Sequence, residues 1–153
     1  MKRFPSLVPL FFCLSAFAQG ADTRLLPADP SELLGMTPAS IIEEFGAPIR
    51  VFALRGEEPW QDDVVFDYGT FSVFLCMDRV WQLRLPPDYP KPVWGFQPGS
   101  GEERISASLG LPAQRDASFA EWSLHGRGWP VRLRVIFGPD GKAEELYVYR
   151  SDF

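Results

Sequence analysis

The stretch IIEEFGAPIR (residues 41–50) repeats its apolar and helix-breaking positions in ISASLGLPAQR (residues 105–115). Four positions correspond at a constant offset of 64 residues: Ile41, Phe45, Gly46 and Pro48 answer to Ile105, Leu109, Gly110 and Pro112. Glycine adopts the left-handed backbone that ends a helix, and a following proline prevents the helix from resuming. The two stretches therefore predict two helices of about two turns, which need a sheet to pack against.

Both predicted helices also have start signals. Thr37 can cap the first helix, and Pro38 suits its first position. Ser100 and Glu103 have the spacing of a capping box at the start of the second helix. The helix and its flanking signals are thus repeated together.

Three strands are predicted after each helix, from the alternation of apolar residues and from turn signals such as GPDG at residues 138–141. They cover residues 64–68, 71–77, 80–85, 119–124, 131–137 and 143–150. The stretch between each helix and its first strand is interpreted as irregular. The predicted fold class is α+β: two tandem units, each a short helix followed by an antiparallel three-stranded meander. The two meanders either stand apart or join in one continuous curved sheet.

The chain divides into a leader and four further segments. Lys2 and Arg3, an apolar run over residues 7–17 and small residues at Ala16 and Ala18 have the order of a secretory signal peptide. We expect a signal peptide over 1–18, an N-terminal extension over 19–33, the first unit over 34–85, a connection over 86–99 and the second unit over 100–153. The connection is rich in proline and aromatic residues and is expected to be ordered.

An exported location, periplasmic or secreted, follows from this leader. Phe11 and Phe12 precede Cys13 where a lipid-attachment cysteine needs small residues, so anchoring through Cys13 is disfavoured. No later segment approaches the ~20 apolar residues of a membrane span. The mature chain is therefore predicted to have no transmembrane segment.

Charge and cysteine content exclude several classes. Loss of Lys2 and Arg3 leaves 13 basic and 20 acidic residues, a net charge of −7, which argues against nucleic acid as a partner. Cys76 becomes the only cysteine, so no internal disulfide can form. With no disulfide, the fold must rest on its apolar core.

Catalytic and cofactor signals are missing from the sequence. His125 is the only histidine, and with Cys76 inside an apolar strand it cannot form a zinc site of the usual kind. Phosphate-binding loops, dinucleotide fingerprints and nucleophile elbows are absent. Adjacent acidic pairs are interpreted as solvated surface. We therefore predict no enzyme activity, no cofactor and no metal.

Alternation along the strands of the first unit assigns Met77, Trp81 and Leu83 to the core side. The opposite strand face holds the candidate partner-binding residues. Tyrosine and arginine dominate binding hot spots, because they bury a large area and keep polar groups available. The candidates are Phe74, Arg132, Arg134, Tyr147 and Tyr149. Two structural interpretations compete with binding. Arg132, Arg134 and Glu145 can form cross-strand ion pairs under the tyrosines, or the connection can cover Phe74 and Cys76.

The segment LLGMTPASIIEEFGAPIRV (residues 33–51), with Trp60 and the strand pair in FSVFLCMDRVWQLRL (residues 71–85), resembles the BamE (SmpA/OmlA) family of outer-membrane assembly proteins. The tandem arrangement, with RVIFGPDGKAEELYVYR (residues 134–150) in the second copy, resembles the beta-lactamase-inhibitor-protein (BLIP) fold. This resemblance implies a non-catalytic protein-binding module of the envelope or the extracellular space. The chain departs from typical BamE proteins because it lacks a convincing lipid-attachment cysteine.

The expected function is that of an exported, non-enzymatic protein-binding module: an inhibitor, an adaptor or an envelope-assembly factor whose partner is another envelope or extracellular protein. One alternative is a small-ligand-binding or hydrolytic periplasmic protein, which requires a pocket where acidic residues meet Arg132 or His125. The other is a structural envelope component that oligomerises through a sheet edge.

Overall fold

The computed structural model describes residues 25–58, 62–125 and 128–153. The predicted signal peptide, Cys13 and Trp60 lie outside these residues.

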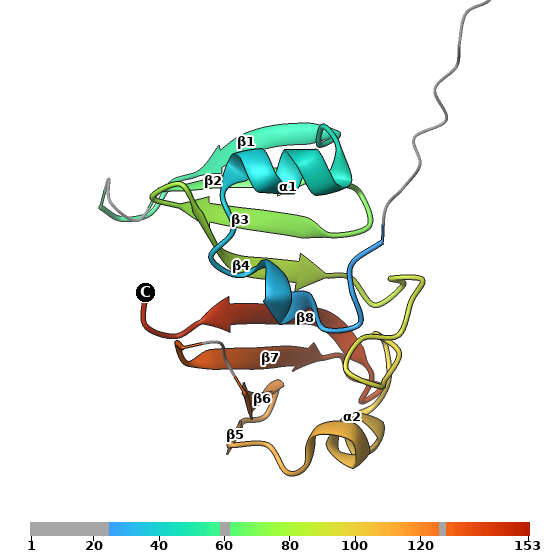
Figure 1. Cartoon of the computed structure of the whole chain (residues 1–153). Helices are drawn as coiled ribbons and strands as arrows, with labels where there is room; N and C mark the ends of the chain where they lie inside the picture. The colour runs from blue at the N-terminus through green and yellow to red at the C-terminus, as the bar shows by residue number, and fades with distance from the viewer. Residues whose placement is uncertain (1–24, 59–61, 126–127) are drawn as a thin grey trace, which may run out of the picture.

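The described chain is dominated by one sheet of eight antiparallel strands, β1 to β8, in the order β1-β2-β3-β4-β8-β7-β6-β5 (Figure 1). The strands are Arg50–Leu54, Asp63–Asp67, Ser72–Cys76, Arg79–Leu85, Gln114–Arg115, Phe119–Leu124, Val131–Phe137 and Ala143–Arg150. The middle of the sheet joins the two halves of the chain, because β4 pairs with β8. The strands β1 and β5 form the two edges.

In the described residues three short helices accompany the sheet: the 3-10 helix η1 (Pro30–Leu33), α1 (Pro38–Phe45) and α2 (Glu102–Leu109). Both predicted α-helices are confirmed in place. Thr37 accepts a hydrogen bond from the Ser40 N–H, and Gly46 ends α1 with a φ of 79°. The capping box predicted for α2 is wrong, because the helix starts one residue later and Gly101 occupies the N-cap without a side-chain bond.

The predicted fold class, an α+β domain of two tandem helix-plus-three-stranded units, is wrong. The structure is one eight-stranded antiparallel sheet with two short α-helices, and it is richer in β-structure than predicted. The six predicted strands are present to within one residue at each end. The additional strands β1 and β5 follow α1 and α2 directly, where irregular chain was expected. Both are exposed on both faces, so neither has the apolar alternation that marks a half-buried strand.

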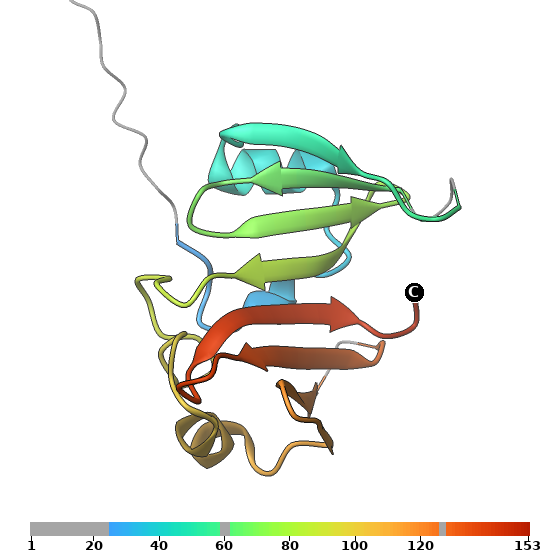
Figure 2. The same cartoon turned by 180° about the vertical axis from the view of Figure 1, so that it is seen from behind.

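The core lies between the sheet and the elements on one of its faces. Figure 1 shows η1 and α1 in front of the sheet, and Figure 2 shows the opposite face with no helix in front of it. Ile41 of α1 and Ile105 of α2 are fully buried against strand residues such as Leu83 and Leu133. Tyr89, Val93 and Phe96 bring the 86–99 connection into the same cluster. The connection therefore belongs to the covered face.

A β-bulge between Phe74 and Leu75 changes the face of one predicted core residue. Val80 and Leu83 are three residues apart on β4 and would lie on opposite faces in a regular strand, yet both point into the core. Trp81 is therefore displaced to the uncovered face, where its Nε1 donates to Asp63 at 2.9 Å. Met77, also predicted for the core, is exposed in the tight β3–β4 turn. The one-residue bulge thus places the Trp81 side chain on the face opposite to the one that regular alternation predicts.

Candidate functional site

One row of polar residues crosses the uncovered face through all eight strands. Each member lies opposite the next in the strand register. We call this set the polar row: Arg50, Asp67, Ser72, Arg84, Tyr147, Arg134, Glu121 and Gln114. It contains Arg134 and Tyr147, two of the five predicted binding residues. The other three, Phe74, Arg132 and Tyr149, lie in the neighbouring row of the same face.

Glu121 organises one end of the polar row. Its side chain is buried, and its Oε2 accepts hydrogen bonds from Arg134 Nε at 3.1 Å and from the Tyr149 hydroxyl at 2.6 Å. Arg132 lies 4.0 Å from the other carboxylate oxygen. Burial and the negative charge of Glu121 raise the pKa of Tyr149 to about 12. Arg134 and Tyr149 are therefore fixed by one carboxylate, and Arg132 lies at ion-pair distance from it.

A second network lies where the polar row crosses from β4 to β8. Arg84 Nε donates to Glu145 Oε1 at 2.9 Å, and the Tyr147 hydroxyl donates to the other oxygen of the same carboxylate. Partial burial acts to raise the pKa of Glu145, but the hydrogen bonds from Tyr147 and Arg84 outweigh it and lower that pKa. Burial and the adjacent Glu145 raise the pKa of the Tyr147 phenol.

The ion pairs differ in their partners from the sequence interpretation. Arg132 and Arg134 meet Glu121 rather than Glu145, because Glu121 of β6 lies directly opposite Arg134. Glu145 is instead bound by Arg84, which the sequence analysis had not singled out. Cross-strand pairs under the tyrosines are thus present, with different acids and bases.

Phe74 is placed on the uncovered face but is only 8% exposed. In the register it lies between Val65 of β2 and Gln82 of β4, and Val65 is also buried. The connection does not supply this cover, since its buried residues belong to the core on the other face. Phe74 therefore packs between its neighbours on the adjacent strands and offers little surface to a partner.

A hollow of about 370 Å³ opens in the uncovered face between the two networks. Its walls are Trp81, Gln82, Arg134, Ile136, Tyr147 and Tyr149. The Arg134 guanidinium lies 4.9 Å from the centre of the Phe119 ring and 5.7 Å from that of Tyr149, at cation–π distances. Three predicted residues, Arg134, Tyr147 and Tyr149, thus surround one cavity with an aromatic and partly charged wall.

Trp81 also lines a larger, mostly apolar hollow of about 780 Å³ beside the β3–β4 turn and the C-terminal residues. Its ring stacks on Phe153 with centroids 6.3 Å apart. Cys76 lies in the same wall, and burial together with the nearby Asp63 raises the pKa of its thiol. A thiol with a raised pKa is mainly protonated at neutral pH, which disfavours nucleophilic chemistry there.

Sequence reasoning missed three residues of the site: Trp81, Arg84 and Glu121. The alternation of β4 assigned Trp81 to the core, because a bulge has no signature in the apolar pattern. Glu121 was missed because it is a single acid between the apolar residues Ala120 and Trp122, and it was not recognised as part of a polar face. The alternation within β6 does place Glu121 on the uncovered face, and that was a usable signal.

The hydrolytic alternative has one structural candidate. A hollow of about 310 Å³ is lined by Asp29, Trp94, Ser108, Leu109, Ser123, Leu124 and His125. The Asp29 carboxylate, however, accepts hydrogen bonds from Ser31 and from Trp94 Nε1, the latter at 2.8 Å. The hydrogen bonds that Asp29 makes to described residues thus hold parts of the fold together. In the described part of the chain, no group of three or more His, Cys, Asp or Glu side chains could hold a metal ion.

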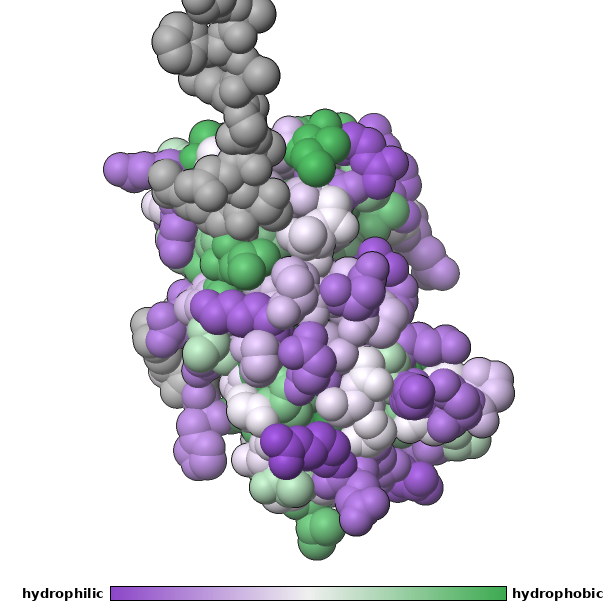
Figure 3. Space-filling view, turned by 90° about the vertical axis from the view of Figure 1, so that its right-hand side faces the viewer, coloured by the Kyte–Doolittle hydropathy of each residue, from purple (hydrophilic) through white to green (hydrophobic). Residues whose placement is uncertain are grey.

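The surface beside the 86–99 connection lies on another side of the molecule from the site. Figure 3 views the molecule from this side and shows mostly hydrophilic residues, with hydrophobic areas that are small and separate. None of the described helices is long and apolar enough to cross a membrane.

No family model and no curated protein matches the sequence. Two solved structures match the chain. The first is an extracellular protein containing an SCP domain from Bacillus anthracis str. Ames, with 8% identity, a TM-score of 0.54 and coverage of 99% of this chain. This chain spans 50% of the length of that protein. The second is the DUF4309 family protein YjgB from Bacillus subtilis subsp. subtilis str. 168, with 14% identity, a TM-score of 0.46 and coverage of 75% of this chain and 78% of that one.

At 8% identity the first structure is informative about the fold alone. Neither structure is named as a BamE or BLIP protein, so the resemblance stated from the sequence stays a prediction.

Proposed function

We propose that this chain is an exported, non-enzymatic module that binds another protein of the cell envelope or extracellular space through the uncovered face of its sheet. The observation that carries the proposal is the hollow of about 370 Å³ bounded by Arg134, Tyr147 and Tyr149. A cavity of this size in an exposed face suits one aromatic or aliphatic anchor side chain of a partner.

Preorganisation supports this role. Tyr149 and Arg134 are both held by Glu121, and Tyr147 by Glu145, so these long side chains have little rotamer freedom left to lose on binding. Immobilising a flexible side chain at an interface costs about 0.5–1.5 kcal/mol, and a fixed one avoids most of this cost. The rigid aromatic wall and its charged rim match the composition of binding hot spots.

Charge on this face is nearly balanced, because the arginines of the two networks are paired with Glu121 and Glu145. A balanced face favours a partner that contributes an apolar or aromatic anchor over one that is recognised by charge alone. The proposal therefore predicts binding that survives moderate salt, since screening weakens mainly exposed charge pairs.

The test is capture of partners from bacterial envelope extracts by the immobilised protein. The variants Tyr147→Ala and Arg134→Ala should each lower the amount of a specific captured protein by about tenfold, in the range expected for hot-spot truncation. Arg104→Ala is the matched control, because Arg104 is an exposed arginine on α2, away from the uncovered face. Equal capture by the wild type and both face variants would overturn the proposal.

The ligand-binding or hydrolytic alternative is favoured by one observation, the 310 Å³ hollow that holds Asp29 and His125. The variant His125→Ala separates the two functions. If the hollow is the functional site, His125→Ala abolishes the activity and Tyr147→Ala leaves it intact. The protein-binding proposal expects the reverse pattern in the capture experiment.

A further inference from the structure

One edge of the sheet is open. Among the described strands β1 has a single neighbour, β2, and all five of its residues are exposed. Val51, Phe52 and Leu54 are exposed to 58%, 42% and 45%. Charged side chains and prolines usually protect an edge from pairing with another chain. The strand contains no lysine or proline, and its one charged residue, Arg50, is paired with Asp67.

The backbone of β2 shows which of its residues face this edge strand. The Tyr68 N–H donates to the Phe71 carbonyl at 3.0 Å, so Tyr68 faces β3. Asp67, one residue earlier, faces β1, because consecutive residues in a strand point their backbone groups to opposite sides. The Ile49 N–H donates to the Asp67 carbonyl at 2.8 Å and agrees with this direction.

The same alternation identifies the free groups of β1. Asp67 lies opposite Arg50, so Arg50 and Phe52 turn their N–H and C=O groups toward β2. Val51 and Ala53 consequently turn theirs toward the open edge. These groups are the ladder positions available to an incoming strand.

We propose that the β1 edge binds a second copy of this chain, through antiparallel β1–β1 pairing about a two-fold axis at Phe52. In this register Val51 and Ala53 of one copy exchange hydrogen bonds with Ala53 and Val51 of the other. Phe52 faces Phe52 across the axis, in the closer, non-hydrogen-bonded type of pair. Arg50 lies opposite Leu54, so no like charges face each other.

Charge on the strand is already neutralised within each copy. Arg50 Nε donates to Asp67 Oδ2 at 2.9 Å, and Arg55 pairs with Asp62. Two copies can therefore approach without opposing unpaired arginines, although the chain as a whole is acidic. The pairing is self-complementary in apolar contacts and neutral in charge, which points to a second copy as the occupant.

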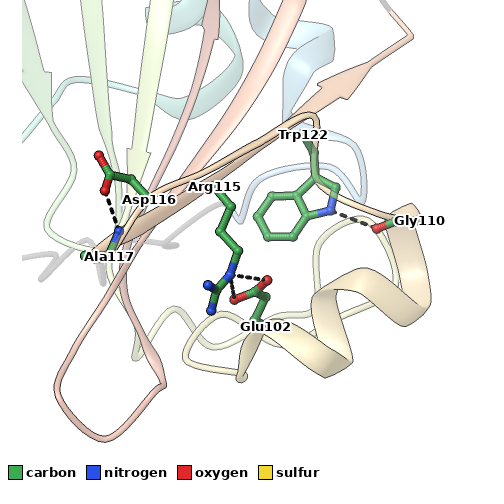
Figure 4. A network of polar contacts seen from close by, with 6 residues as sticks. All are labelled: Glu102, Gly110, Arg115, Asp116, Ala117 and Trp122. Carbon is green, nitrogen blue, oxygen red and sulfur yellow. Dashed lines mark hydrogen bonds and ion pairs between the residues drawn. The ribbon is translucent and has the colours of Figure 1, made fainter.

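The opposite edge explains why the assembly closes at two copies. β5 has only two residues, Gln114 and Arg115, and the Arg115 Nε is held by both oxygens of Glu102 at 2.9 and 3.0 Å (Figure 4). A β1-to-β5 contact would repeat without end and give filaments, whereas β1–β1 pairing is isologous and finite. An edge strand of only two residues offers too few ladder positions for the β1-to-β5 contact.

Sedimentation velocity over a range of protein concentrations tests this inference, which does not rest on the proposed binding face. The wild type should show a monomer–dimer equilibrium. Phe52→Lys places two ammonium groups against each other and should raise the dissociation constant about tenfold or more. Val51→Pro should do the same, because it removes an outward N–H without removing a bond to β2.

Leu111→Lys is the control, since Leu111 is 89% exposed and lies near the other edge. This variant should associate like the wild type, and circular dichroism should show a folded sheet for all four proteins. A wild type that stays monomeric at every concentration would overturn the inference. So would a dimer that both β1 variants leave unchanged.

Discussion

The two edges of the sheet end in different ways. β1 exposes five residues, three of them large and apolar, whereas β5 is two residues long and its arginine is paired with Glu102 of α2. Each edge is nevertheless backed by one buried acid of the polar row, Asp67 beside β1 and Glu121 beside β5, both 7% exposed. Both edges thus have a buried acid beneath them and a paired arginine, and they differ in the length and apolar content of the edge strand.

The largest expected difference comes from removing an aromatic residue near each edge. Trp122, 1% exposed and bonded through Nε1 to the Gly110 carbonyl at 2.9 Å, ties β6 to the end of α2. Trp122→Ala should lower the free energy of unfolding by about 3–5 kcal/mol. Phe52→Ala should lower it by only about 1 kcal/mol, because Phe52 is 42% exposed and lies outside the core. Urea unfolding at low protein concentration measures both, and equal losses would contradict the contrast between the edges.

A smaller difference is expected between the two buried acids. Glu121→Gln leaves Arg134 and the Tyr149 hydroxyl without their carboxylate and should cost about 1–3 kcal/mol. Asp67→Asn should cost less than about 1 kcal/mol, because its partner Arg50 is largely exposed and regains water. Thermal unfolding of the two variants compares them, and a larger cost at Asp67 would refute this ranking.

Acid should weaken the β1 side through Asp67. Burial acts to raise the pKa of this carboxyl, but hydrogen bonds from the Gly69 N–H and from Arg50 outweigh it and lower the pKa below 3.8. The unfolded chain then binds the proton first, so the stabilisation is present above pH 3.8 and is lost as the pH falls through the folded-state pKa. Unfolding measured between about pH 2.5 and 6 should show a shallower acid decline for Asp67→Asn than for the wild type. Superimposable profiles would exclude this role of Asp67.

The smallest effect is expected at the β5 edge itself. Arg115 is mostly exposed, so Arg115→Ala should lower the free energy of unfolding by less than about 1 kcal/mol. Its informative readout is association, because the variant removes the charge from a two-residue edge. A new concentration-dependent oligomer in this variant would show that the Arg115–Glu102 pair protects β5. An unchanged sedimentation profile would assign the protection to the shortness of the strand.

Most of the strand pattern could be predicted from the sequence, because residues such as Leu83 and Leu133 alternate with polar neighbours and are buried on one face. The fold class was wrong because β1 and β5 have no buried face, and an exposed strand leaves no periodic signal. The pairing of β4 with β8 depends on contacts far apart in the sequence, which local patterns do not encode.

The candidate site was also predictable in part, because alternation along a strand fixes the face on which each residue lies. Alternation along β7 and β8 placed Arg134 and Tyr147 on the face that the structure leaves uncovered. Their true partners, Glu121 and Arg84, depend on the register between strands and could not be read from either strand alone. The bulge that brings Trp81 to this face is likewise a property of the β3–β4 pairing.

Amide hydrogen exchange of β1 at two protein concentrations tests the difference between the edges most directly. The Val51 and Ala53 amides point away from β2 and should exchange rapidly in the dilute protein. At a concentration where the dimer forms, both should slow by about tenfold or more, because the second copy accepts their hydrogen bonds. The amides of Gln114 and Arg115 should keep the same rates. Rates at Val51 and Ala53 that do not depend on concentration would contradict the account.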